Sequence, residues 1–232
     1  MGTRTHDTLW YDVQVNKRSA RVSVYLQGLK SAIRFLEEQN KRVCLALPRI
    51  TKPGESGPVV NYFRDLSPDA LLVRNTAQME QLAMMIKTGA GGHGHGHDHD
   101  RPTHFPFPRL DGDFSLNIAN AISAALFLQQ GLSSISPTHD LNADQISHLA
   151  LSLGPLLDQR HHHHHPLEVI LHHHLPIFHT EFCAYARFLS KGNSFVDCGY
   201  PCTRLNLQMR DQKGDDHAVM ADMGCRNTVR EG

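Results

Sequence analysis

Short apolar runs alternate along this chain with segments of helical periodicity, and this alternation restricts the folds available to it. Arg42–Leu47 (RVCLAL) and Ala70–Val73 (ALLV) lack the in-and-out polarity of a sheet with one solvated face. Such runs are typical of parallel strands that are buried on both faces and joined by helical crossovers. The sequence therefore predicts an α/β fold.

The predicted elements follow one another in strand–helix order. Strands are predicted at Arg21–Leu26, Arg42–Leu47, Ala70–Val73, Arg109–Gly112, Ser133–Ser136 and Leu167–Leu171. Helices are predicted at Leu29–Gln39, Ala77–Ile86, Leu116–Leu128 and Leu141–Leu153, the last with Asn142 as its cap. An open doubly wound sheet and a (β/α) barrel both agree with this order, although no GxGxxG turn follows the first strand to indicate dinucleotide binding.

Four of the five cysteines lie in the last fifty residues. They are Cys183, Cys198, Cys202 and Cys225. Thiolates are soft ligands, and four of them make a closed zinc or iron–sulfur site. Spacing does not choose between the two metals, since the chain has no Cys-x2-Cys knuckle. Four unrelated buried thiols are the plain structural alternative, and disulfides are disfavoured because nothing at the N-terminus looks secretory. Cys44, inside an apolar run, is predicted to be a core residue.

The residues around these cysteines form a long motif. Its pieces are His174–Cys183 (HLPIFHTEFC), Cys198–Cys202 (CGYPC), Met209–Asp211 with Gly214 and His217, and Ala221–Val229 (ADMGCRNTV). This order resembles the collagenase-like peptidase family (peptidase family U-thirty-two), in the branch with the signature HLPxFHxExC…CGxPC…LRDxxGxxHxxxADxGCRNTV. Leu47–Ile50, Leu72–Asn75 and Gly112–Asn117 are similar to that branch too, so the resemblance covers roughly residues 22–229 apart from two insertions.

The resemblance implies a TIM-type (β/α) barrel. About six of its eight strands are predicted here, so the barrel is expected to be incomplete, its first strands lying before residue 20, in a missing N-terminal portion or in a partner chain. The expected organisation is an irregular segment at 1–20, the partial barrel at 21–178 and a Cys-rich metal-binding segment at 179–232. The insertions at 89–108 and 159–166 hold ten of the eighteen histidines. Their Gly, His, Asp and Pro content predicts surface loops.

A barrel gathers its chemistry at the C-terminal ends of its strands. Candidate substrate-binding residues at those ends are Arg49, Arg74, Asn75, Asp113 and Asn117. The arginines are suited to hold a carboxylate or phosphate in a fork. Candidates for proton transfer are His174, His179 and Glu181, with His139 in addition. Each of these residues has a structural alternative, as a helix cap, as a salt-bridge partner or, for His179 and Glu181, as a neighbour that tunes the metal site.

The family name denotes peptidases, but the chain has neither a GxSxG elbow nor an HExxH helix. Other members of the family are iron–sulfur proteins that help to hydroxylate RNA bases or quinone precursors. In many members a cysteine occupies the place of Pro176, so Cys225 is expected to replace that ligand. The resemblance thus implies a [4Fe–4S] cluster on the four cysteines and a role in hydroxylation. A peptidase acting on collagen-like substrates and a non-catalytic zinc-stabilised protein are the alternatives.

Charge and hydropathy limit the partners. Lys and Arg number 23, as do Asp and Glu, so the net charge is zero and no overall field attracts nucleic acid or an anionic membrane. An RNA substrate would need a local patch, for which the chain offers Arg204, Arg210, Arg226 and Arg230. A small aromatic substrate is the other expectation. No membrane-length apolar run and no signal peptide are found. We therefore expect no secretion, and cytoplasm and organelle both stay open.

Overall fold

The computed structural model describes residues 8–12, 19–51, 66–88, 107–157, 166–192, 197–222 and 225–231. The chain divides into two compact units, Met1–Val169 (unit 1) and Ile170–Gly232 (unit 2). The expected domain limits after residues 20 and 178 stay predictions. Both His-rich insertions lie outside the described residues, except for positions 107, 108 and 166.

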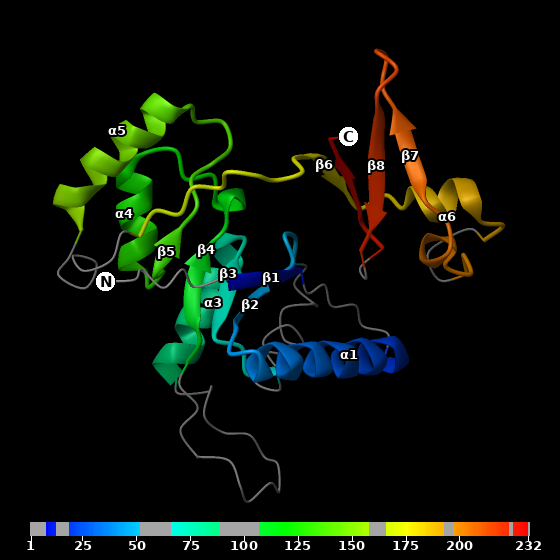
Figure 1. The fold of residues 1–232 in the computed structure, drawn as a ribbon, viewed down its shortest axis with the longest axis horizontal. Helices are drawn as coiled ribbons and strands as arrows, with labels where there is room; N and C mark the ends of the chain where they lie inside the picture. Colours follow the sequence, from blue (N-terminus) through cyan, green and yellow to red (C-terminus); the bar gives the residue numbers. More distant parts are fainter. Residues whose placement is uncertain are drawn as a thin grey trace, which may run out of the picture. The chain divides into compact units, whose positions relative to one another are not determined.

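Unit 1 contains a parallel sheet whose strands follow chain order, β1-β2-β3-β4-β5 (Figure 1). The strands are β1 (Thr8–Asp12), β2 (Arg42–Ala46), β3 (Ala70–Val73), β4 (Arg109–Gly112) and β5 (Ser134–Ile135). The four strands β2 to β5 pair successively, and β1 adds a fifth beside β2. Within the described ranges β1 and β5 do not pair with each other, so no closed barrel is formed.

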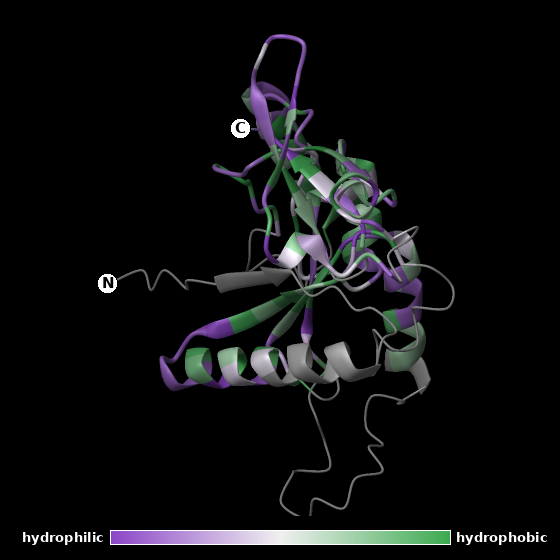
Figure 2. Ribbon diagram, turned by 90° about the vertical axis from the view of Figure 1, so that its right-hand side faces the viewer, coloured by the Kyte–Doolittle hydropathy of each residue, from purple (hydrophilic) through white to green (hydrophobic). Residues whose placement is uncertain are grey.

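The helices of unit 1 pack their apolar residues into one core with the sheet. They are α1 (Ser19–Glu38), α3 (Thr76–Thr88), α4 (Ala121–Gln129) and α5 (Ala143–Leu153), with 3-10 turns η1 (Phe114–Leu116) and η2 (Gly154–Leu156). The described half of α1 alternates hydrophobic and hydrophilic residues (Figure 2). Its apolar face meets Leu45 of β2 and Leu71 of β3 in that core. Burial of this apolar surface is the main stabilising contribution to such a fold.

Both faces of the central strands are buried, as their unbroken apolar sequences predict. Leu45 and Leu71 face the helices. The alternate positions Cys44, Ala46 and Leu72 form a second, smaller cluster with Ala70. The strands predicted at Ala70–Val73 and Arg109–Gly112 are confirmed to the residue, and the one predicted at Arg42–Leu47 ends one residue earlier.

The prediction of a strand at Arg21–Leu26 is wrong, because these residues belong to α1. The β-branched and aromatic residues of RVSVYL suggested a strand. However, the apolar spacing of Leu26, Leu29, Ile33 and Leu36 is that of one helical face and continues through the segment. The helical spacing of the longer segment thus outweighs the local strand propensity of RVSVYL. The strand that precedes α1 is instead β1, in the stretch that was expected to be irregular.

Two other predicted elements have different limits. The helix expected at Leu116–Leu128 is interrupted, because Asn117 has a left-handed backbone (φ 55°) that closes η1. Asn120 then starts α4, accepting a hydrogen bond from the Ser123 N–H at 2.9 Å. The strand expected at Leu167–Leu171 is wrong, since within this segment only Leu167 forms a bridge, to Ile135 of β5.

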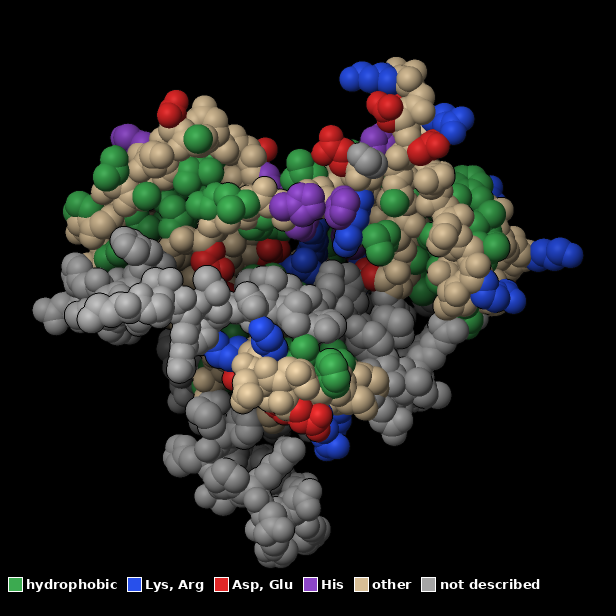
Figure 3. Space-filling model, in the orientation of Figure 1, with side chains coloured by type: hydrophobic (Ala, Val, Ile, Leu, Met, Phe, Trp, Pro, Cys, Tyr) green, Lys and Arg blue, Asp and Glu red, His purple; other side chains and the backbone are tan. Residues whose placement is uncertain are grey.

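The α5 prediction is confirmed with its cap. Asn142 accepts from the Gln145 N–H, and the Gln145 side chain accepts from the Asn142 N–H, both at 2.9 Å. This reciprocal capping box satisfies two of the amide donors that a helix start leaves without partners. Apolar side chains of α4 and α5 are also exposed, among them Ile122, Leu126 and Leu151, and Figure 3 shows hydrophobic side chains gathered over the region of these two helices.

Unit 2 is built on an antiparallel sheet in the order β6-β9-β8-β7. Its elements are β6 (Pro176–Thr180), α6 (Ala184–Leu189), the 3-10 turn η3 (Pro201–Thr203), β7 (Leu207–Arg210), β8 (Asp216–Ala221) and β9 (Asn227–Arg230). Tyr185 of α6 packs with Val219 and Val229 in a small core. Its hydroxyl donates to the Val219 carbonyl at 2.7 Å and accepts from the Leu207 N–H at 3.2 Å. No helix in the described part of the chain is both long and apolar enough to span a membrane.

Candidate functional site

The C-terminal edge of the parallel sheet brings two predicted substrate-binding residues together as an ion pair. Arg74 follows β3 and Asp113 follows β4. The Arg74 Nε atom lies 3.1 Å from Asp113 Oδ2, and the two side chains are only 8% and 6% exposed. Ser115 donates to the same carboxylate oxygen at 2.8 Å, while Arg74 also donates to the Leu47 carbonyl at 3.2 Å. The buried charge of Arg74 is thus compensated by the carboxylate of Asp113, at the end of the neighbouring strand.

Asn75 has the role of a helix cap. Its side-chain oxygen accepts from the Gln78 N–H at 3.0 Å, at the start of α3, and its amide donates to the Arg49 carbonyl at 3.1 Å. Gln78 itself is 1% exposed. It donates to the Pro48 carbonyl at 2.7 Å and accepts from the Arg74 N–H at 2.8 Å. Sequence reasoning did not identify Gln78, although an Asn followed three residues later by Gln is a recognisable capping pattern.

Arg49 lies against an aromatic pair at the same edge. Its guanidinium carbon is 5.0 Å from the ring centroid of Phe114, within the usual range of a cation–π contact. The Phe114 ring centroid is 4.1 Å from that of His139. Asn117 ends η1 close by in sequence, where its backbone N–H donates to the Phe114 carbonyl. Arg49, Arg74, Asn75 and Asp113 therefore belong to one connected set of contacts, to which sequence reasoning did not assign Phe114.

The three proton-transfer candidates of unit 2 each contact a different neighbour. His179 of β6 has Nδ1 2.7 Å from the Thr228 hydroxyl of β9. Glu181 has an oxygen 3.8 Å from Nε of Arg226, whose side chain is 5% exposed. His174 precedes β6, and its ring centroid lies 5.7 Å from that of His172. His179 is thus held against β9 by strand pairing, and Glu181, which follows β6, lies beside Arg226, which precedes β9; these contacts give both side chains a structural role.

The four C-terminal cysteines all lie in unit 2, and none of the five cysteines forms a disulfide. Cys183 is the residue before α6, and Cys202 belongs to η3. Both pack against the core of Tyr185, Val219 and Val229. Cys198 precedes a tight turn in which Gly199 and Tyr200 have positive φ angles of 66° and 56°. Cys225 also has a positive φ, 60°, two residues before β9 begins.

Asn227 links β9 to the first of these cysteines. This residue is 1% exposed, its side-chain oxygen accepts from the Ala184 N–H at 2.7 Å, and its amide nitrogen lies 4.0 Å from the Cys183 sulfur. The amide thus fixes the first turn of α6 and gives the Cys183 sulfur a donor. Sequence reasoning did not single out Asn227, although it lies in the motif ADMGCRNTV.

The donor types suit a metal–thiolate centre, but their positions do not make one as they stand. Among the described residues, no three His, Cys, Asp or Glu side chains are placed to hold one metal ion together. Binding four thiolates to one cluster would therefore require the Cys198–Cys202 turn and the approach to β9 to move the sulfurs toward one another. No chemical step is assigned to such a cluster on this geometry. Neither a family model nor a curated protein nor a solved structure matches this chain.

Proposed function

We propose that this chain is an iron–sulfur protein of the collagenase-like peptidase family and that it supports hydroxylation of an aromatic substrate. In this proposal Cys183, Cys198, Cys202 and Cys225 are the ligands of a [4Fe–4S] cluster. The observation that carries it is that all four lie in one small unit and that Cys183 and Cys202 pack on the same core. A cluster held by four thiolates supplies electron transfer.

Unit 1 is proposed to be part of a TIM-type barrel. Its parallel strands follow one another in chain order, whereas a doubly wound sheet reverses direction at a switch point. The second, smaller cluster contains three small side chains, those of Cys44, Ala46 and Ala70, which agree with the interior of a curved sheet. The C-terminal edge with Arg49 and Phe114 is then the substrate face.

An aromatic substrate is supported by the Arg49, Phe114 and His139 group. Aromatic rings and a guanidinium plane are the groups on which flat rings stack, whether the ring is a nucleobase or a quinone precursor. The smaller substrate is proposed because two of the four arginines expected to attract RNA are engaged by carboxylates. Arg226 is buried beside Glu181, and Arg210 forms a fork with Asp216 at 2.8 Å.

The first test is anaerobic purification of the untagged chain, followed by an absorption spectrum and analysis of iron, sulfide and zinc. We expect a brown protein with about four irons per chain. Cys202→Ser should bleach it, whereas Cys44→Ala, which changes a fully buried cysteine of unit 1, should keep the colour. A colourless protein with one zinc, lost together with the fold on chelation, would replace this proposal by the zinc-stabilised alternative. Metal-independent cleavage of gelatin would favour the peptidase.

A further inference from the structure

A pocket opens at the opposite edge of the parallel sheet from the Arg49 and Arg74 group. Arg42, Val43, Asp69, Ala70 and Arg109 line it, and its volume is about 160 Å³. Arg42 and Arg109 are the first residues of β2 and β4, and Asp69 immediately precedes β3. A single water needs roughly 10–15 Å³ measured in this way, so the pocket has room for a group of several heavy atoms.

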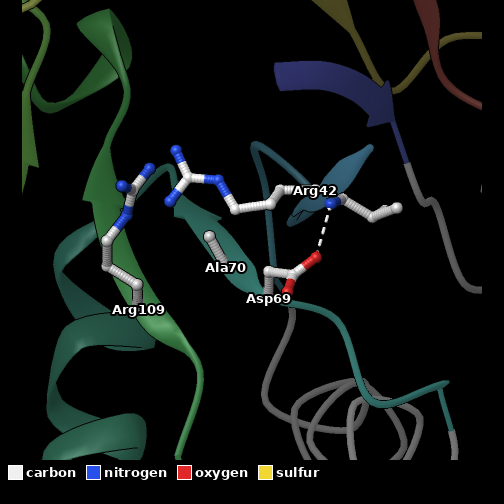
Figure 4. A pocket seen from close by; sticks show the side chains of 5 residues that line it. Arg42, Asp69, Ala70 and Arg109 are labelled. Carbon is white, nitrogen blue, oxygen red and sulfur yellow. Dashed lines mark hydrogen bonds between the residues drawn. The ribbon is translucent and has the colours of Figure 1, made fainter. Parts of the chain in front are cut away.

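The two arginine side chains are directed toward each other. Figure 4 shows the Arg42 side chain crossing above Ala70, with its guanidinium facing that of Arg109. The carboxylate of Asp69 is also part of the wall, and its Oδ2 accepts from the Val43 N–H at 2.7 Å. Within the described part of the chain, the Arg42 guanidinium makes no hydrogen bond or ion pair. The guanidinium donors of Arg42 are therefore not bound by the carboxylate of Asp69. They point into the pocket, beside the guanidinium of Arg109.

Arg109 is held in place from behind. Its Nε and one terminal nitrogen donate to Asp111 Oδ2 at 3.1 and 2.7 Å, and the Asp111 side chain is 1% exposed. Burial lowers the pKa of Arg109, but the hydrogen bond and charge of Asp111 raise it above its usual value, so the guanidinium is charged. Arg109 lines the pocket, where its guanidinium faces that of Arg42 (Figure 4). Two guanidinium cations that face each other repel, and an anion between them removes that repulsion.

We propose that this pocket binds a phosphate group between the guanidinium groups of Arg42 and Arg109. Guanidinium groups present planar pairs of donors that match phosphate oxygens, and the two arginines offer them from neighbouring sides. Asp111 neutralises Arg109 from behind and Asp69 adds a negative charge at the wall, so the pocket carries little net charge. Recognition therefore depends on directed hydrogen bonds, and the affinity is modest, roughly millimolar for phosphate alone.

The test is calorimetric titration of the full chain with inorganic phosphate and, separately, with methyl phosphate, at constant ionic strength. We expect saturable binding at one site per chain. Arg42→Gln is the decisive variant, because this exposed side chain has no described partner whose loss would harm the fold; it should weaken binding at least tenfold. Lys30→Gln removes one positive charge from an exposed position on α1 and should leave binding unchanged. Asp69→Asn should bind as tightly as the parent chain or more tightly.

The two ligands distinguish the source of the phosphate. Binding of inorganic phosphate alone indicates free phosphate, and binding of both indicates a phosphomonoester. No saturable binding of either, or equal weakening by Arg42→Gln and Lys30→Gln, would overturn the proposal. Arg109→Gln is a supporting variant whose circular dichroism must match the parent chain, since it removes the cationic partner of buried Asp111.

Discussion

Replacing Asp113 by alanine should destabilise unit 1 strongly, because it removes the carboxylate that compensates the buried guanidinium of Arg74. The atoms lie 3.1 Å apart, and both side chains are less than one-tenth exposed. Removing one partner of such a pair typically costs about 3–5 kcal/mol. Ser115 loses its acceptor at the same time. With a urea m-value of about 2 kcal/mol per M, the unfolding midpoint should fall by roughly 1.5–2.5 M.

The single tryptophan provides the assay. Trp10 belongs to β1, which pairs with β2 in the parallel sheet, so its fluorescence in a urea titration reports the unfolding of unit 1. Asp140→Ala is the matched control. It removes an exposed carboxylate that accepts one hydrogen bond, from the Thr138 hydroxyl at 3.0 Å, and should cost only about 1 kcal/mol.

A double variant tests the reason for the loss. If an uncompensated buried charge is the cause, Arg74→Met combined with Asp113→Leu should be more stable than Asp113→Ala alone, since an apolar pair leaves no charge behind. Two results would refute the reasoning. One is a loss of unfolding free energy below about 1 kcal/mol for Asp113→Ala. The other is a double variant whose loss of unfolding free energy equals the sum of the losses of Arg74→Met and Asp113→Leu measured singly.

Three further predictions concern separate parts of the chain. Burial, followed by the charge of Asp111, raises the pKa of the Cys44 thiol. A thiol reagent at neutral pH should therefore modify no more than four cysteines in the metal-free native chain and all five in the unfolded chain. Fast modification of five cysteines in the native chain would contradict this. Asn142→Ala removes the capping box of α5 and should cost about 1 kcal/mol in urea unfolding, while an unchanged midpoint would mean that the cap is not formed. The hydrogen bond from Arg210 lowers the pKa of Asp216, so this pair stabilises unit 2 above the usual aspartate pKa and the contribution is lost as the pH falls through the lowered value. Arg210→Gln should move the carbon-13 carboxyl titration of Asp216 up toward the usual pKa, and an unshifted titration would refute the pair.

The parallel sheet could be predicted because its signal is local. A strand buried on both faces must be apolar at every position, and β2 and β3 are short enough for that signal to stand out. The error at Arg21–Leu26 has the same origin. In a short window a β-branched run looks like a strand, and only the longer spacing through Leu36 shows the helical face.

The antiparallel sheet of unit 2 gave no such signal. β7 and β8 carry mostly exposed or half-exposed residues, because a small sheet with a three-residue core leaves most positions in contact with solvent. Its stability depends on strand pairing and on hydrogen bonds within its turns. One example is Asp211, whose carboxylate accepts from the Lys213 and Asp215 N–H groups in the hairpin turn. Such contacts are not visible in hydrophobic periodicity.

At the candidate site, the sequence predicts which residues lie together but not what each of them does. Topology put Arg74 and Asp113 at one edge because parallel strands end together, and this could be predicted. Their role could not, because it depends on which donors and acceptors the fold satisfies internally. Arg74 and Asp113 bind each other, and Asn75 caps α3. At this edge Arg49 lies over the ring of Phe114, and this contact is the reason why Arg49 is the residue proposed to meet an aromatic substrate.

The two edges of the sheet differ in how far their polar side chains are satisfied by partners within the protein. At the C-terminal edge the buried cation meets a buried anion across neighbouring strands, so the arrangement is complete without a ligand. At the N-terminal edge Asp111 satisfies only part of Arg109, and Arg42 turns its donors toward the pocket instead of toward Asp69. A ligand gains most where protein donors have no internal acceptor, because there it does not have to break an existing hydrogen bond. On this argument phosphate binding and the proposed hydroxylation use opposite edges of one sheet, and Arg42→Gln should remove the first without changing the contacts of Arg49.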